Sequence, residues 1–277
     1  MISVSKKDIN WYGIIFFLTV TILLLYSLYT RGYRLLPGFS VKQASNVVLS
    51  TNIQNISLML DGKLIVDAIH DSTGKIYLGN IYPGKHNIIV NKSGYSSWIK
   101  TFNLPPETTL TFDSFIIPKM LGDLTGKINY LKIGTKEYSY ALEQFNYYQK
   151  PTPTEPVRSP NGTLDAWVED RKVFIRWVDK PSLMPPYLCN PLKCEKIAQV
   201  YKSKNPISSI SFWDDATLAV STGEYLLIIE IDRRGGQNVE RLHSDTSISH
   251  MTDRSSGKLV LFIKDSSSIM SVEFPNE

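Results

Sequence analysis

Alternation of apolar and polar residues dominates the chain between residues 47 and 118, and this period of two is typical of half-buried β-strands. In residues 81–102, IYPGKHNIIVNKSGYSSWIKTF, a Pro-Gly turn precedes one alternating run and a Gly-Tyr pair precedes a second. Asp61-Gly62 separates two earlier runs, and Asp-Gly supplies the positive φ angles that a tight hairpin turn requires. The pattern predicts about seven short strands, the organisation of a small β-sandwich.

A second β-rich region is expected over residues 158–277, where a pattern of turns and strands recurs. Its three segments read SPNGTLDAWVEDRKVFIRWVDK, ISSISFWDDATLAVSTGEYLLIIEIDRRGGQN and ISHMTDRSSGKLVLFIKDSSSIMSVEF. Their starts lie roughly 40 to 50 residues apart, which is the period of propeller blades. Because a propeller needs about four blades to close, we expect a partial, propeller-like array of antiparallel sheets. Its open edge would pack on the first β unit or on another protein.

The N-terminal region has a different pattern, because residues 10–30 carry no charge. About 20 apolar residues suffice to cross a bilayer, and aromatic residues at both ends of such a run are typical of membrane interfaces. Those residues are Trp11, Tyr12, Tyr26 and Tyr29. The alternatives are a buried core helix and a cleaved signal peptide, but the run is long for a signal peptide and no small-residue cleavage pattern follows it. We therefore predict a retained transmembrane helix.

The predicted fold class is mainly β, with six parts along the chain. They are an N-terminal tail (1–10), a transmembrane helix (11–30), a juxtamembrane spacer (31–46), a β-sandwich (47–118), a transition with a Pro/Thr-rich linker (119–157) and a propeller-like region (158–277). Composition agrees, since 43% of the 277 residues are hydrophobic and frequent Tyr, Ile, Val and Thr favour strands.

Two cysteines, Cys189 and Cys194, bear on the side of the membrane that the β regions occupy. Basic residues flank both ends of the apolar run, so the positive-inside rule leaves the orientation nearly undecided. The cysteine spacing does not match a zinc site or a Cys-x-x-Cys redox motif. A disulfide is favoured over two unrelated thiols, and it implies an oxidising compartment. We therefore predict a cytoplasmic N-terminus and an extracytoplasmic bulk of the chain.

The segments LDGK, IYPGKHNIIVNKSGY and IKTFNL resemble the PEGA domain, a small β-sandwich of bacterial and archaeal surface proteins. The residues that match its pattern are Asp61, Gly62, Pro83, Gly84, His86, Gly94 and Tyr95. The sequence between the two halves departs from the family, because IVDAIHDSTGKIYLGN replaces the usual Gly-x-Thr-Pro. The resemblance covers about a quarter of the chain and implies a fold without a catalytic residue set.

Few residues suggest chemistry, and each has a structural alternative. Arg233 and Arg234 in DRRGGQN could bind an anion, or the loop could simply reverse the chain after a strand. Asp214 and Asp215 could act as an acid–base pair or hold a cation, although a plain turn is favoured. His86 could be a ligand but is expected to be a half-buried strand residue. Tyr95 and Trp98 could stack on a sugar, or they could belong to the core or its rim.

The sequence has no nucleotide-binding motif and no nucleophile elbow. A net charge of +4 without a basic block argues against nucleic-acid binding. We expect no enzymatic activity, no cofactor and no bound metal. The predicted function is an interaction or scaffold module of the cell envelope whose partners are the lipid bilayer and another envelope protein. The alternatives are a glycan-binding module that recognises cell-surface glycan and a β region that faces the cytosol.

Overall fold

The computed structural model is mainly β, with several antiparallel sheets and one apolar N-terminal helix. This confirms the coarse fold class predicted above. The structure describes residues 6–36, 39–51, 53–65, 69–70, 74–117, 119, 128–148, 156–189, 193–253, 259–265 and 268–274. The chain divides into two compact units. Unit 1 comprises residues 1–50, 67–86 and 103–112, and unit 2 comprises residues 51–66, 87–102 and 113–277.

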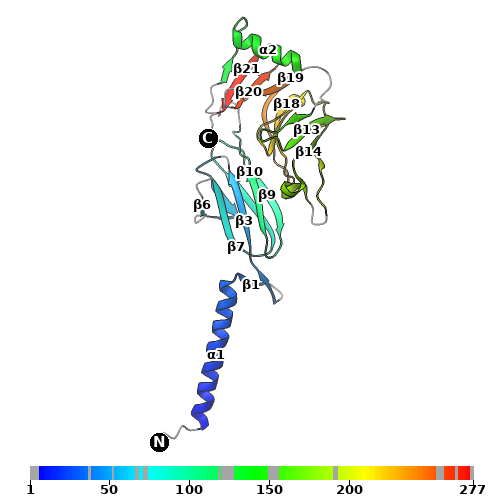
Figure 1. Ribbon diagram of the computed structural model, residues 1–277. Coiled ribbons are helices and arrows are strands. Elements are labelled where there is room, and N and C mark those ends of the chain that lie inside the picture. The colour runs from blue at the N-terminus through cyan, green and yellow to red at the C-terminus, as the bar shows by residue number, and fades with distance from the viewer. Residues whose placement is uncertain are drawn as a thin grey trace. The chain divides into compact units, whose positions relative to one another are not determined.

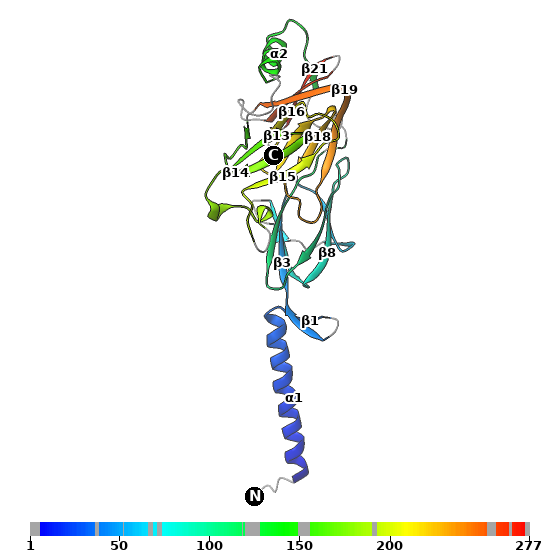
Figure 2. The same ribbon diagram turned by 90° about the vertical axis from the view of Figure 1, so that its right-hand side faces the viewer.

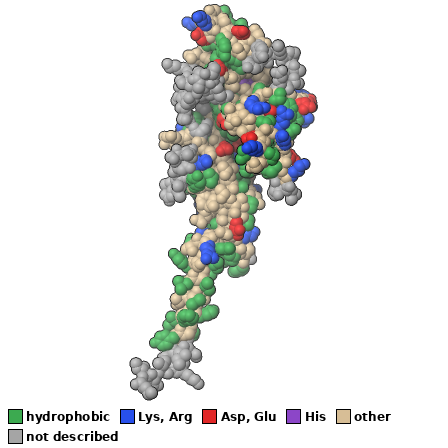
Figure 3. Space-filling model, in the orientation of Figure 1, with side chains coloured by type: hydrophobic (Ala, Val, Ile, Leu, Met, Phe, Trp, Pro, Cys, Tyr) green, Lys and Arg blue, Asp and Glu red, His purple; other side chains and the backbone are tan. Residues whose placement is uncertain are grey.

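Unit 1 begins with helix α1 (Lys6–Thr30), drawn in blue in Figure 1. Its central side chains are apolar and exposed on all sides, and Figure 3 shows them as a hydrophobic surface along the helix. A two-stranded hairpin follows, formed by β1 (Tyr33–Leu36) and β2 (Ser40–Gln43). The segment predicted as a spacer, residues 31–46, therefore contains regular structure.

Two four-stranded sheets follow the hairpin. One has the order β10-β3-β7-β6, with β3 (Ser45–Thr51), β6 (Ile69–His70), β7 (Lys75–Ile81) and β10 (Thr109–Ser114), mostly in unit 1. The other has the order β5-β4-β8-β9, with β4 (Ser57–Leu60), β5 (Lys63–Leu64), β8 (Gly84–Asn91) and β9 (Trp98–Leu104), mostly in unit 2. In β9 every second residue is buried, as the predicted alternation requires.

Unit 2 contains a third four-stranded sheet, which forms a simple antiparallel meander. Its order is β12-β13-β14-β15, with β12 (Val157–Arg158), β13 (Leu164–Glu169), β14 (Lys172–Trp177) and β15 (Ile197–Lys202). Two short 3-10 turns, Pro181–Leu183 and Pro186–Leu188, lie between β14 and β15. Figure 2 shows β13, β14 and β15 near β16 and β18 of the next sheet.

The remaining strands of unit 2 form a seven-stranded sheet in the order β11-β21-β20-β19-β18-β17-β16. The strands are β11 (Ile128–Tyr130), β16 (Ser209–Phe212), β17 (Thr217–Ser221), β18 (Gly223–Glu230), β19 (Val239–Asp253), β20 (Leu259–Lys264) and β21 (Ile269–Phe274). The first part of β19 pairs with β18 and its last five residues pair with β20. The sheet therefore has two four-stranded parts that share β19, and β11 completes the second by pairing with β21.

Among the described residues of unit 2, apolar clusters of three kinds stabilise the sheets. The first joins β13, β14 and β15 to one face of β16, β17 and β18, with Trp177, Leu218 and Ile229 among its buried members. The second covers the opposite face of β17 and β18 and continues under β20 and β21. The third seats helix α2 (Lys136–Tyr148) on the sheet through Ala141 and Phe145. Burial of such side chains stabilises the fold by roughly 1.5–3 kcal/mol each.

Helix α2 lies in the segment 119–157, which was predicted as a transition and linker. Its apolar residues Tyr138, Ala141, Leu142 and Phe145 follow the spacing of a helix with one buried face. Tyr and Gln are frequent around this segment, and the flanking segments favour strands. The helical period is therefore inconspicuous in the sequence. Thr135 begins the helix, since its hydroxyl accepts a hydrogen bond from the Tyr138 N–H at 3.2 Å.

Candidate functional site

The loop after β18, residues 232–238, is tied down by internal contacts. The Arg234 guanidinium makes a bidentate ion pair with the Asp232 carboxylate through its Nε and Nη2 atoms, and Nη2 lies 2.7 Å from Oδ2. Arg233 donates a hydrogen bond to the carbonyl of Gln199 on β15, and Gln237 donates to the neighbouring carbonyl of Val200 at 2.7 Å. Both arginines therefore have protein partners, and the loop covers part of the β15 edge.

The same loop is joined to β9 by backbone contact. The Thr101 N–H donates to the Gly235 carbonyl at 2.7 Å, and Asn238 contacts the backbone of Ile99 on both its N–H and its carbonyl. Gly235 has a φ angle of +70°, and a Cβ atom there would lie 2.6 Å from the Thr101 carbonyl oxygen. Glycine is required here because the two backbones approach closely at a left-handed residue.

Replacing Gly235 by alanine is expected to lower the free energy of unfolding by about 2–4 kcal/mol, since backbone strain and overpacking add. Gly236→Ala is the matched control, because Gly236 also has a positive φ but open space at its Cβ position. Denaturant unfolding of the detergent-solubilised chain measures both. Equal losses for the two variants would show that the approach to Thr101 does not matter.

A buried ion pair lies beneath this loop. Lys100 on β9 and Glu230 at the end of β18 are 0% and 2% exposed, and their Nζ and Oε2 atoms are 2.7 Å apart. The ammonium also donates to the carbonyls of Asp232 and Gly236, both at 2.6 Å. Burial raises the pKa of Glu230, whereas the Lys100 ammonium opposes that rise. Every charged atom of the pair thus has close partners, as a buried pair requires.

The burial of Trp98 decides between ligand contact and core packing, the two roles that the sequence leaves open for it. Its side chain is fully buried, and its Nε1–H donates to Oε1 of Glu230 at 3.0 Å. Its face is therefore not available for stacking on a ligand. Tyr95 is half-buried, and the Lys92 ammonium lies 4.9 Å from its ring centroid. The two aromatic residues do not form a common surface, and Trp98 belongs to the core.

The other predicted PEGA positions occupy turns and strand ends. Asp61 and Gly62 form the turn between β4 and β5 with φ angles of 51° and 76°, as the Asp-Gly pattern predicted. Gly94 also has a positive φ of 80°. Pro83 directly precedes β8, and Gly84 is its first residue. His86 is half-buried on β8, and its Nε2 lies 2.6 Å from the Tyr82 carbonyl oxygen.

Asp214 and Asp215 have separate turn-stabilising contacts. Oδ1 of Asp214 accepts hydrogen bonds from the Ala216 N–H and the Thr217 hydroxyl, each at 2.7 Å, and burial raises the pKa of Asp214. Oδ1 of Asp215 accepts from the Asn161 N–H at 2.9 Å. These contacts match the turn that was favoured for this pair. Among the described residues, no group of three or more His, Cys, Asp or Glu could hold a metal ion.

A buried histidine with three serines was not identified from the sequence. The His250 ring nitrogens lie within 3.0 Å of the hydroxyls of Ser209, Ser211 and Ser221. Ser209 and Ser211 alternate on β16, which indicates a common face, but no local pattern could place β19 against that face. Burial lowers the pKa of His250 to about 3. The cluster is therefore a neutral internal network that the hydroxyls satisfy.

The low pKa of His250 makes stability pH-dependent. At pH 5 the unfolded chain protonates this histidine, whereas the folded chain does not until the pH approaches 3. Its contribution is complete above about pH 6.5 and is lost at roughly 1.4 kcal/mol per pH unit as the pH falls. We expect His250→Gln to remove this slope, measured as the difference between variant and wild-type unfolding free energies at pH 6.5 and 4.5. Parallel pH profiles would contradict the assignment.

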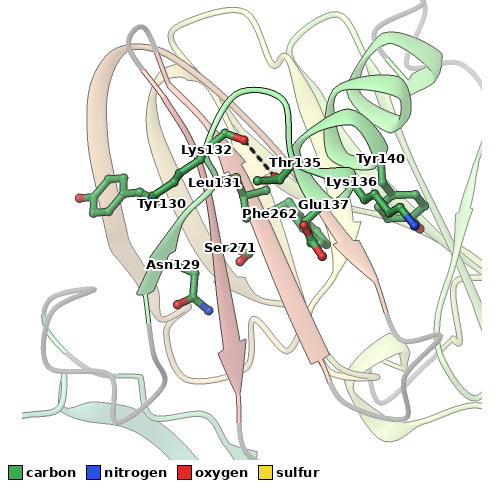
Figure 4. A pocket seen from close by; sticks show the side chains of 10 residues that line it. All are labelled: Asn129, Tyr130, Leu131, Lys132, Thr135, Lys136, Glu137, Tyr140, Phe262 and Ser271. Atoms are coloured by element: carbon green, nitrogen blue, oxygen red, sulfur yellow. Dashed lines mark hydrogen bonds between the residues drawn. The ribbon is translucent and has the colours of Figure 1, made fainter.

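A hollow of about 600 Å³ lies where β11 meets the first turn of α2 (Figure 4). Leu131, Phe262 and Ser271 line it together with residues of both elements. The rings of Phe262 and Tyr140 meet edge to face at 6.4 Å between centroids. The other lining residues are Asn129, Tyr130, Lys132, Thr135, Lys136 and Glu137.

The rim of this hollow is apolar as well as charged. Tyr130 lines the hollow and is 67% exposed, which is high for a large aromatic side chain. Lys132, Lys136 and Glu137 supply charges of both signs around it. Exposed aromatic and aliphatic groups with a polar rim are typical of surfaces that bind another protein. The arrangement is therefore suited to binding a partner through an apolar anchor residue.

Cys189 and Cys194 are joined by a disulfide. The Glu195 N–H donates to the Leu188 carbonyl at 2.8 Å, so the chain doubles back as a small loop between the 3-10 turn and β15. In the chain-entropy model, closing so small a loop stabilises the fold by roughly 2 kcal/mol.

The sequence matches no known family model and no curated protein. A solved structure described as "AfRom2 CNH domain" is similar to this chain at 12% identity with a TM-score of 0.26. The similarity covers 76% of this chain and 71% of that chain. A TM-score of this size does not show a shared fold, so the similarity carries no argument. The PEGA resemblance stays a prediction.

Proposed function

We propose that this chain is a single-pass membrane protein whose β-rich part is a non-catalytic interaction module of the cell envelope. Helix α1 is the observation that carries the proposal. Its segment Trp11–Thr30 has 20 residues, a mean hydropathy of 2.0 and no residue buried against the rest of the protein. At 1.5 Å per residue it is about 30 Å long, the thickness of a bilayer's hydrocarbon core.

The proposed orientation places the N-terminus in the cytoplasm and residues 31–277 outside it. The disulfide between Cys189 and Cys194 supports this orientation, because disulfides persist in oxidising compartments and are rare in the cytosol. Retention of α1 is favoured by the residues after it, which lack a small-residue cleavage pattern.

The hollow beside α2 supports an interaction role. It presents Tyr130 on the surface of unit 2 with charged residues around it. The polar groups that could suggest chemistry instead have internal partners, as for Arg234, Glu230 and His250. The proposed partner is another envelope protein that inserts an apolar side chain into the hollow. Burial of Trp98 removes the residue on which the glycan-binding alternative depended most.

The proposed architecture is a PEGA-type β-sandwich followed by a propeller-like array. The sheets β10-β3-β7-β6 and β5-β4-β8-β9 each have four strands, which is compatible with the strand number of a small sandwich. The sheet β12-β13-β14-β15 and the two parts of the seven-stranded sheet are three successive four-stranded antiparallel units, as blades would be. Completion of the last unit by β11 is compatible with a blade that borrows its outer strand from earlier in the chain.

Cysteine labelling in intact cells tests the orientation. We expect a membrane-impermeant maleimide to modify Cys189 and Cys194 only after an impermeant reductant has been added, because both thiols lie outside and are bonded. The control is a Ser3→Cys variant, whose thiol should react only after the cells are permeabilised. Thiols at 189 and 194 that react only in permeabilised cells, without reductant, would place the β region in the cytosol and refute the proposal.

Site-specific photo-crosslinking tests the interaction role. A photoreactive amino acid at position 130, an exposed lining residue, should give a discrete adduct with one envelope protein, and Tyr140→Ala should reduce that adduct. A photoreactive group at Lys202, an exposed residue at the end of β15, is the matched control. Equal adducts from both positions, or none from position 130, would contradict partner binding at the hollow.

A further inference from the structure

The hairpin of β1 and β2 directly follows α1 and has an apolar and a basic face. Its register pairs Leu35 with Val41 and Arg34 with Lys42. Since side chains alternate between the two faces of a strand pair, the first pair shares one face and the second pair shares the other. Leu35 and Val41 are 61% and 58% exposed, and Phe39 between the strands is 91% exposed. Three apolar side chains are thus presented to the surroundings.

Contacts with the last helical turn fix the hairpin to α1. The Arg34 guanidinium lies 4.1 Å from the Tyr29 ring centroid, and its Nη1 donates to the Tyr29 carbonyl at 2.8 Å. The Gln43 side chain donates to the Arg31 carbonyl at 3.2 Å, and the Ala44 N–H donates to the Gly32 carbonyl at 2.7 Å. Figure 2 shows the hairpin projecting sideways beside the C-terminal end of α1.

This attachment sets the depth of the hairpin if α1 spans a bilayer, and to that extent the inference rests on the proposed function. The apolar segment ends at Thr30, and Tyr26 and Tyr29 mark the interface near that end. The hairpin starts at Tyr33, three residues beyond the segment. Phe39, Leu35 and Val41 therefore lie at the boundary between headgroups and acyl chains, where exposed apolar side chains gain by leaving water.

We propose that the β1–β2 hairpin is a second membrane-binding element, which inserts Phe39, Leu35 and Val41 into the interfacial layer of the lipid surface beside α1. The occupant of its apolar face is lipid, because the hairpin begins three residues beyond the apolar segment of α1 and carries exposed apolar side chains together with basic ones. Arg31, Arg34 and Lys42 lie in the hairpin or directly before it. Their positive charges complement the negative charges of the lipid phosphate groups. The hairpin orients the β region relative to the membrane surface.

Depth-dependent quenching tests the proposal with the full chain in vesicles of phosphatidylcholine and phosphatidylglycerol. Since both native cysteines are disulfide-bonded, an introduced cysteine is the single free thiol for an environment-sensitive dye. The variants are Phe39→Cys and Val41→Cys on the hairpin, Leu25→Cys in α1 and Lys75→Cys on β7. Lys75 is exposed and pairs with Ser50 at the far end of β3, so it is the matched control in unit 1.

We expect roughly twofold quenching at positions 39 and 41 by lipids that carry a doxyl group near the headgroup, because interfacial elements reach about 5–10 Å into this layer. Position 75 should not be quenched. Quenching at position 25 but not at 39 and 41 would overturn the inference and leave the anchor intact. Dye that is shielded without lipid quenching, in proportion to protein density, would show a second copy on the hairpin and overturn it too. No quenching at position 25 would refute the anchor and the hairpin together.

Discussion

Replacing Lys100 by methionine is expected to lower the free energy of unfolding by about 3–5 kcal/mol, because it leaves the Glu230 carboxylate buried without its counter-ion. The pair lies within unit 2 and is almost fully buried. Without the ammonium, burial raises the pKa of Glu230 further, and only the hydrogen bonds from Asn238 and Trp98 oppose that rise. Thermal or denaturant unfolding of the detergent-solubilised chain measures the loss.

A double variant separates loss of charge pairing from loss of packing. Glu230→Gln removes the second charge but keeps an acceptor for the Trp98 N–H, so Lys100→Met with Glu230→Gln should recover much of the lost stability. Lys202→Met, at an exposed position, should change stability by at most about 0.5 kcal/mol. If Lys100→Met lowers the free energy of unfolding no more than Lys202→Met does, the buried pair is not a determinant of stability.

Placing arginine at both Val20 and Leu24 is expected to abolish membrane retention of the chain. Each central arginine disfavours insertion by about 3 kcal/mol, so the pair should cost about 6 kcal/mol. Both side chains are exposed on α1 in the structure, so the substitutions should not disturb the packing of the β-sheets. Resistance of the full chain to alkaline carbonate extraction measures retention.

The matched control adds the same two charges outside α1. Ile133 and Val239 are exposed apolar residues on unit 2, and arginine at both positions should leave extraction resistance unchanged. Loss of retention in this control would indicate general misfolding. Full retention of the Val20→Arg, Leu24→Arg variant would mean that α1 does not hold the chain in the membrane.

The elements with a local signal were predictable from the sequence. The uncharged run predicts α1, and the period of two predicts the buried face of β9. Each of these signals lies within one continuous segment of the chain. The turn at Asp61-Gly62 was predictable for the same reason, since the dipeptide itself favours positive φ. The helical spacing in α2 was also present, but strand-like neighbours obscured it.

Features that depend on distant partners could not be predicted. Lys100 occupies a core position on β9, and only the structure brings Glu230 and two loop carbonyls to its ammonium. Trp98 lies on the predicted buried face of β9, but only the structure shows that its N–H donates to Glu230. His250 is far in sequence from Ser209 and Ser211, so their contact requires knowledge of how β16 lies against β19.

The pairing of β11 with β21 has a consequence for how the chain matures. Ile128 is opposite Val272, so about 140 residues must be synthesised before the partner of β11 exists, and long-range pairing of this kind forms slowly. Until then the edge of β11 is open to other chains. The C-terminal sheet is therefore the part of the molecule for which a folding chaperone would be most useful, in the interval between synthesis of Tyr130 and synthesis of Met270.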